Sequence, residues 1–148
     1  MTARIAVGAL VVAALMPHAA LADDTGYFAP GGIALSGYDV VAYFTEGVPV
    51  EGEADHALIW RGATWYFAST ETLMSFEMDP EAFAPQFGGH CAYGMSEGDT
   101  VSPAPTAFFI QDGKLYFMHT DALLAAMRER LPEIVAAAEG NWATLQGR

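Results

Sequence analysis

The residues best suited to chemistry lie in one short segment, "QFGGHCAYGMSEG", which spans residues 86–98. It contains Cys91, the single cysteine of the chain, with His90 before it and Met95 four residues after it. A thiolate, a thioether and an imidazole are donors that suit copper, above all Cu(I) in a site of low coordination number. Because residues four apart share a helix face, one helical turn would bring the Cys91 and Met95 sulfurs together.

Two further donors, Met118 and His119, follow an aromatic run later in the chain. Adjacent residues of a strand face opposite ways, so only one of them can point toward the cysteine segment. We therefore expect a soft-metal site, with Cu(I) favoured. Cys91 would be its anionic ligand and Met95 its thioether, and His90 with Met118 or His119 would complete it.

Other chemistries fit the same segment less well. Structural zinc takes four ligands, commonly in paired short spacings, and no C-x-x-C pair is present. A nucleophilic cysteine needs a base and a group that orients the base. His90 adjoins Cys91 and would point away from it, although His119 could approach. The sequence has no phosphate loop, nucleophile elbow or zinc-protease motif, so we expect a protein that is not an enzyme.

The alternative is a metal-free interaction or small-ligand-binding module in which Cys91 is buried core. Cysteine is among the most buried residue types and packs as a small hydrophobic group. Most of the aromatic residues belong to expected strands, but a minority could line a pocket. The set comprises Tyr38, Tyr43, Phe44, Trp60, Trp65, Tyr66, Phe67, Phe108, Phe109, Tyr116 and Phe117.

Two β-hairpins are expected to position these residues. The segment "ALIWRGATWYFAS" alternates around Arg61-Gly62, and "TAFFIQDGKLYFMHT" turns at Asp112-Gly113, a favoured hairpin turn. Helices are expected over about 39–44, from a cap at Ser69 or Thr70 to about Met78, briefly from Pro80, after a cap at Asp121, and from Pro132. The order predicts an α+β fold: a small antiparallel sheet of two hairpins covered by short helices, with a C-terminal helix pair.

The N-terminal residues 1–22 have the pattern of a secretory signal peptide. Arg4 precedes an apolar run from Ile5 to Met16, and the segment ends in the small-x-small sequence Ala20-Leu21-Ala22. The run is shorter than the roughly 20 residues that span a bilayer. We therefore expect residues 23–148 to form one exported domain, periplasmic or secreted, with no membrane insertion after cleavage.

The acidic composition limits the classes of molecule that the protein can bind. The chain has a formal charge of −12, and all 18 of its acidic residues follow residue 22. Such a field repels nucleic acid and attracts cations or basic surfaces. The expected partners are therefore a metal ion and, for its delivery, another exported protein.

The run "TWYFASTETLMSFEMDPEAFAP" resembles the YHS domain, with Phe67, Ser69, Phe76, Pro80 and Phe83 at the positions of its pattern. The flanking "GYDVVAYF" and "GGHCA" are similar to the exported branch of YHS domain-containing proteins, and the resemblance extends from about Gly31 to Leu145. It implies a small fold like that of treble-clef metal domains. YHS modules elsewhere are associated with heavy-metal handling through cysteines.

The chain departs from the YHS pattern at those cysteines. Ala68 and Thr72 stand where the pattern has them, and neither can supply a thiolate. The metal role of these two positions therefore does not transfer. The departures near Cys91 add donors instead: His90 replaces a typical aromatic residue, Met95 an ordinary small or apolar one, and Met118-His119 ends a strand that is not usually histidine-rich.

Overall fold

The computed structural model describes residues 25–147. It is α+β, as expected, with two separate two-stranded antiparallel sheets. The first pairs β1 (Glu53–Trp60) with β2 (Ala63–Phe67), and the second pairs β3 (Phe108–Gln111) with β4 (Lys114–Phe117). The predicted signal peptide, residues 1–22, lies outside the described residues. No helix within 25–147 is both long enough and apolar enough to cross a membrane.

The expectation of one sheet made from both hairpins is wrong. Other parts of the chain occupy the strand edges through which the hairpins could join. Ile33 forms a parallel bridge with Thr64 on β2, and Cys91 forms one with Phe117 on β4. These bridges occupy part of the free edges of β2 and β4, and the two hairpins form separate sheets.

Local signals set the helices that cover the sheets. They are α1 (Ala42–Thr45), α2 (Thr70–Met78), α3 (Pro80–Phe83), α4 (Ala92–Ser96), α5 (Asp121–Met127) and α6 (Leu131–Gln146). Ser69 caps α2 as predicted, since its hydroxyl accepts the Thr72 N–H. The predicted Asp121 cap is wrong by one residue, because the Thr120 hydroxyl accepts the Leu123 N–H.

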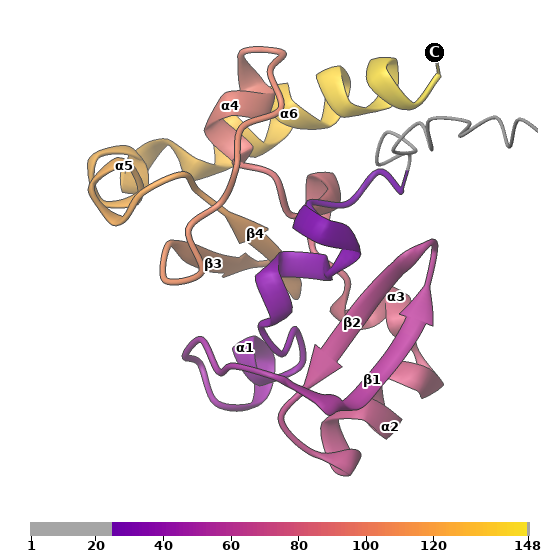
Figure 1. Cartoon of the computed structure of the whole chain (residues 1–148). Helices are drawn as coiled ribbons and strands as arrows, with labels where there is room; N and C mark the ends of the chain where they lie inside the picture. Colours follow the sequence, from indigo (N-terminus) through magenta and orange to yellow (C-terminus); the bar gives the residue numbers. More distant parts are fainter. Residues whose placement is uncertain (1–24, 148) are drawn as a thin grey trace, which may run out of the picture.

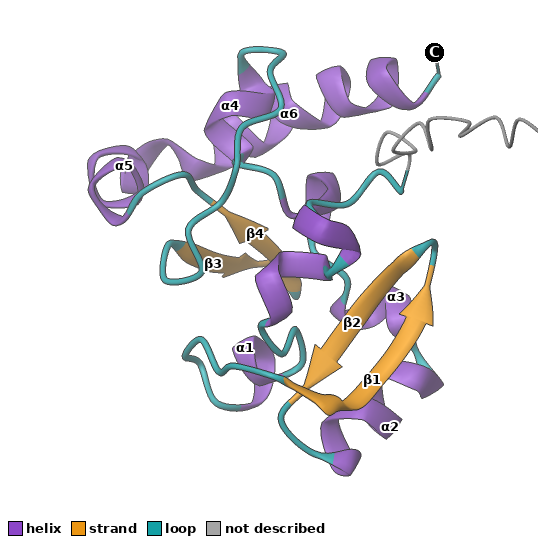
Figure 2. Cartoon of the chain, viewed as in Figure 1, coloured by secondary structure: helices purple, strands orange, loops and turns teal. Residues whose placement is uncertain are grey.

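Short 3-10 segments connect these elements: η1 (Pro30–Gly32), η2 (Ala34–Gly37), η3 (Gln86–Gly89) and η4 (Arg128–Arg130). The β3–β4 hairpin lies between α1 on one side and α4, α5 and α6 on the other, whereas the β1–β2 hairpin packs with α2 and α3 (Figure 1). Figure 2 shows how much of the chain between the strands is short helix and loop.

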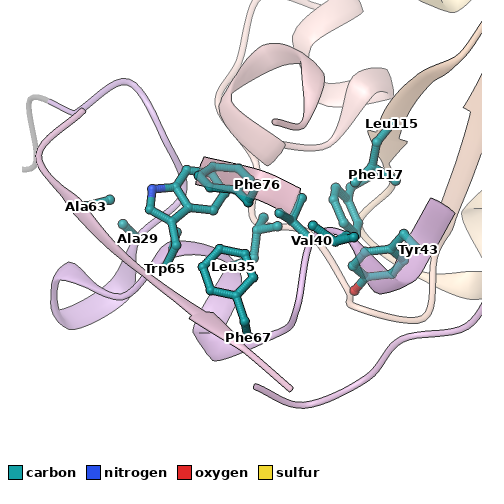
Figure 3. Packing of buried hydrophobic residues seen from close by; sticks show 12 residues of the cluster. Ala29, Leu35, Val40, Tyr43, Ala63, Trp65, Phe67, Phe76, Leu115 and Phe117 are labelled. Atoms are coloured by element: carbon teal, nitrogen blue, oxygen red, sulfur yellow. The ribbon is translucent and has the colours of Figure 1, made fainter. Parts of the chain in front are cut away.

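The interior has two apolar clusters, and β4 separates them. Leu115 and Phe117 belong to the first cluster with Trp65 and Phe76, as Figure 3 shows. Tyr116 belongs to the second, which lies against α4 and α6. This division follows from strand geometry, because successive side chains of β4 point to opposite faces.

Candidate functional site

The backbone around Cys91 is held in place from several sides. Gly88 and Gly89 have φ values of +62° and +82°, which turn the chain sharply before the cysteine. The Cys91 N–H donates to the Val101 carbonyl at 2.8 Å. Cys91 is also the N-cap of α4, and its sulfur accepts the Gly94 N–H at 3.4 Å. The thiol thus lies at a fixed position within the fold.

The three predicted sulfur donors share one apolar surrounding. Cys91, Met95 and Met118 are 1%, 0% and 0% exposed, and all three belong to the second apolar cluster. Met95 lies one turn beyond Cys91, with its N–H donating to the Cys91 carbonyl at 2.9 Å. The structure therefore brings the sulfurs of these residues into the same part of the core.

The two predicted histidine ligands lie elsewhere. Met118 points into the core, so its neighbour His119 points outward, where its Nδ1 contacts the Ser102 carbonyl oxygen at 2.7 Å. His90 is half-buried between the rings of Phe28 and Trp142, at centroid distances of 6.0 and 6.5 Å. Within residues 25–147, no group of three or more His, Cys, Asp or Glu side chains is placed to hold a metal.

Backbone and apolar groups surround the Cys91 sulfur. The hydrogen-bond donor to the Cys91 sulfur is a backbone N–H, and His119 is engaged with a carbonyl at the surface. The whole Cys91 residue is only 1% exposed. The buried thiol is better described as a core group that caps α4.

A second feature is a cavity at the surface. A cavity of about 710 Å³ lies between the N-terminal arm, residues 25–30, and the end of α6. We call it the binding groove. Its lining is Thr25, Gly26, Tyr27, Phe28, Ala29, Pro30, His90, Thr100, Trp142, Leu145 and Gln146. Four of these are aromatic or imidazole rings, and none carries a carboxylate, ammonium or guanidinium group.

Packing onto the turn before Cys91 holds the arm in position. The Phe28 N–H donates to the Gly88 carbonyl at 2.7 Å, and the Leu35 N–H donates to the Phe28 carbonyl at 2.9 Å. On the other wall, Asn141 of α6 donates to the Met95 and Ser96 carbonyls at 2.9 and 3.0 Å. These contacts fix α6 to α4 and place Trp142 in the groove.

A smaller cavity of about 250 Å³ adjoins the groove and shares Tyr27 and Trp142 with it. Its lining includes charged groups. Arg61 pairs there with Glu81, and its guanidinium lies 4.6 Å from the centroid of the Trp60 ring. The opposite charges of Arg61 and Glu81 thus compensate each other beside the groove.

The two titratable groups in the groove both favour their neutral forms. Burial lowers the pKa of His90, because the imidazolium loses hydration there. Burial also raises the pKa of the Tyr27 hydroxyl, although Arg61 partly opposes this. The lining is therefore uncharged at neutral pH.

Replacing His90 by glutamine is expected to flatten the pH dependence of stability below about pH 6.5. Since folding lowers this pKa, the unfolded chain takes up the proton more readily. The contribution of His90 to stability is therefore fully present above its unfolded-state pKa, and it is lost as the pH falls toward the folded-state pKa. Urea unfolding at several pH values measures this, with His119→Gln as the exposed control. Parallel curves for His90→Gln and the unmodified protein would contradict the effect.

Comparison with family models, curated proteins and solved structures finds no match to this chain. The resemblance to YHS proteins therefore stays a prediction, and function has to be argued from the groove and the sulfur cluster.

Sequence reasoning did not identify the groove residues Tyr27, Phe28 and Trp142 as a site. One signal was present: a Tyr-Phe pair in an arm with no partner strand needs a surface on which to pack. That surface includes Trp142, more than a hundred residues away, and local patterns do not show such a pairing.

Proposed function

We propose that this protein is a non-catalytic binding module and that a small organic molecule occupies its binding groove. The observation that carries the proposal is the uncharged, ring-lined cavity of about 710 Å³, a volume within the usual range for small-ligand sites. A few polar groups, His90, Thr100 and Gln146, accompany the rings, as is typical of sites that orient a ligand through few hydrogen bonds. On the basis of residues 1–22, we place this activity in the periplasm or outside the cell.

The three tryptophans supply a test with an internal reference. In protein labelled with 5-fluorotryptophan, we expect the ¹⁹F resonance of Trp142 to shift on addition of indole, benzyl alcohol or choline. Trp65 is 1% exposed in the first cluster, so its resonance should stay in place. If none of the three probes moves the Trp142 resonance, the groove does not bind small molecules of these classes and the proposal fails.

A matched pair of variants locates the binding. Phe28→Leu removes a ring from the groove and keeps the Trp142 reporter, and it should weaken binding about fivefold to tenfold. Phe44→Leu removes a partly buried ring that packs on the first cluster, so it should leave the affinity unchanged. Equal losses in both variants would show that stability, rather than groove contact, controls the binding.

A second candidate is soft-metal binding, with Cu(I) favoured. The observation in its favour is that Cys91, Met95 and Met118 lie in the same buried cluster. A thiolate and two thioethers form a donor set that suits Cu(I) without an imidazole. In this role the protein would handle or deliver the metal to another exported protein.

Anaerobic titration with Cu(I) against a competing chelator tests this candidate. Cys91→Ser, Met95→Leu and Met118→Leu should each weaken Cu(I) binding at least about tenfold, since each removes a soft ligand. Met74→Leu is the matched control, because Met74 is 54% exposed on α2. Unchanged affinity in all three core variants would remove the sulfur cluster from consideration and leave Cys91 as packing.

A further inference from the structure

We propose that the binding groove selects a soft organic cation of the quaternary ammonium class. This inference rests on the proposed function, since it names the ligand class of the same groove. Its basis is the combination of aromatic rings, an uncharged lining and a strongly acidic molecule.

The rings supply the attraction at short range. Tyr27, Phe28 and Trp142 line the groove, and the His90 ring lies between those of Phe28 and Trp142. Aromatic faces carry the negative side of a quadrupole, and a cation within about 6 Å of a ring centroid is attracted to it. Because His90 is held neutral by burial, it adds no opposing positive charge.

The acidic residues supply the attraction at long range. The chain has 18 acidic and six basic residues, so its surroundings are enriched in cations and depleted of anions. Among residues 25–147, Arg61 lines the adjoining smaller cavity and is already paired with Glu81. An anionic ligand would therefore approach against the field and find no cationic side chain in the lining.

The lack of carboxylates in the groove lining favours weakly hydrated cations over strongly hydrated ones. A metal ion or a primary ammonium loses strong hydration on entry and needs anionic or carbonyl oxygens in return. The groove lining has no Asp or Glu side chain, so only neutral oxygens, such as those of Thr100 and Gln146, could replace that hydration. A quaternary ammonium is weakly hydrated and has no N–H to satisfy, so aromatic rings alone can hold it.

Choline and its uncharged isostere 3,3-dimethylbutan-1-ol provide the test, followed by the Trp142 fluorine resonance and by calorimetry. We expect choline to bind about tenfold more tightly than the alcohol. Its affinity should fall at least about twofold between about 20 mM and 500 mM sodium chloride, because salt screens the acidic field. In Trp142→Leu, measured by calorimetry, the preference for choline should largely disappear.

The outcomes separate this inference from the proposed function. If the alcohol binds as tightly as choline, or if indole and benzyl alcohol bind and choline does not, the cation preference is overturned and the groove remains a ligand site. If no probe shifts the Trp142 resonance, both proposals fail. A choline preference that persists unchanged in Trp142→Leu places the cation elsewhere and overturns the inference.

Discussion

Replacing Asp39 by alanine is expected to lower the free energy of unfolding by about 3–5 kcal/mol, because each buried donor left without an acceptor costs about 1–3 kcal/mol. Asp39 is 0% exposed and is the one fully buried acidic side chain among residues 25–147. Its carboxylate accepts the N–H groups of Val41 and Ala68, both at 2.9 Å, and the Thr72 hydroxyl at 2.7 Å. The Ala42 N–H adds a longer bond at 3.3 Å, and alanine would remove the acceptor that these four donors share.

Equilibrium urea unfolding measures the loss, and Asp121→Ala is the matched control. Asp121 accepts one hydroxyl, that of Thr106, at 2.9 Å, but it does so at the surface. Its replacement should cost less than about 1 kcal/mol. Thr72→Val removes one of the Asp39 donors and should cost an intermediate amount, about 1–2 kcal/mol. Similar losses for Asp39→Ala and Asp121→Ala would refute the role of Asp39 as a buried anchor.

The contacts of Asp39 bear on the YHS resemblance. Ala68 and Thr72 occupy the positions at which the YHS pattern has cysteines, and both donate to Oδ2 of Asp39. Oδ1 accepts the Val41 and Ala42 N–H groups at the start of α1. Asp39 thus links α1, the end of β2 and the start of α2.

Replacing Gly88 by alanine is the second large effect that we expect, with a loss of about 2–5 kcal/mol in the free energy of unfolding. Two costs add. Gly88 has a φ of +62°, where a residue with a Cβ costs about 1–2 kcal/mol. An added Cβ would also lie 1.8 Å from the Gly26 carbonyl oxygen, so the arm must move, and such overpacking costs about 1–3 kcal/mol.

Gly47→Ala separates these two costs. Gly47 has a similar φ of +70°, but an added Cβ there meets no atom within 4 Å. The control should lose only the conformational part, about 1–2 kcal/mol. Hydrogen exchange should in addition show lost protection of the Phe28 amide in Gly88→Ala alone, because that amide donates to the Gly88 carbonyl. Equal losses in the two variants would contradict the close packing of the arm on Gly88.

The Gly88 variant also links stability to function. The arm forms one wall of the binding groove, so displacing it should weaken ligand binding even in molecules that remain folded. Loss of the Trp142 ¹⁹F shift in Gly88→Ala, with the shift retained in Gly47→Ala, is the expected pattern. Gly88 thus has a structural role in seating the arm.

The sequence by itself determined the local structure of this protein. Arg61-Gly62 and Asp112-Gly113 form the two hairpin turns, all four with positive φ, and the Ser69 cap and Pro80 start a helix each, as predicted. These features depend on residues a few positions apart, because turns and caps are made by neighbouring backbone and side-chain groups. Donor spacing likewise placed Met95 one helical turn after Cys91.

Only the tertiary structure decided how these elements join and which side chains face the core, the groove or the surface. The two hairpins form separate sheets, with Ile33 and Cys91 bridged to β2 and β4, and the burial of Met118 turns His119 to the surface. The groove joins Phe28 with Trp142, and Asp39 reaches Thr72, across long stretches of chain. Periodicity and capping do not encode such pairings, because they arise from packing and from satisfying buried polar groups over the whole fold.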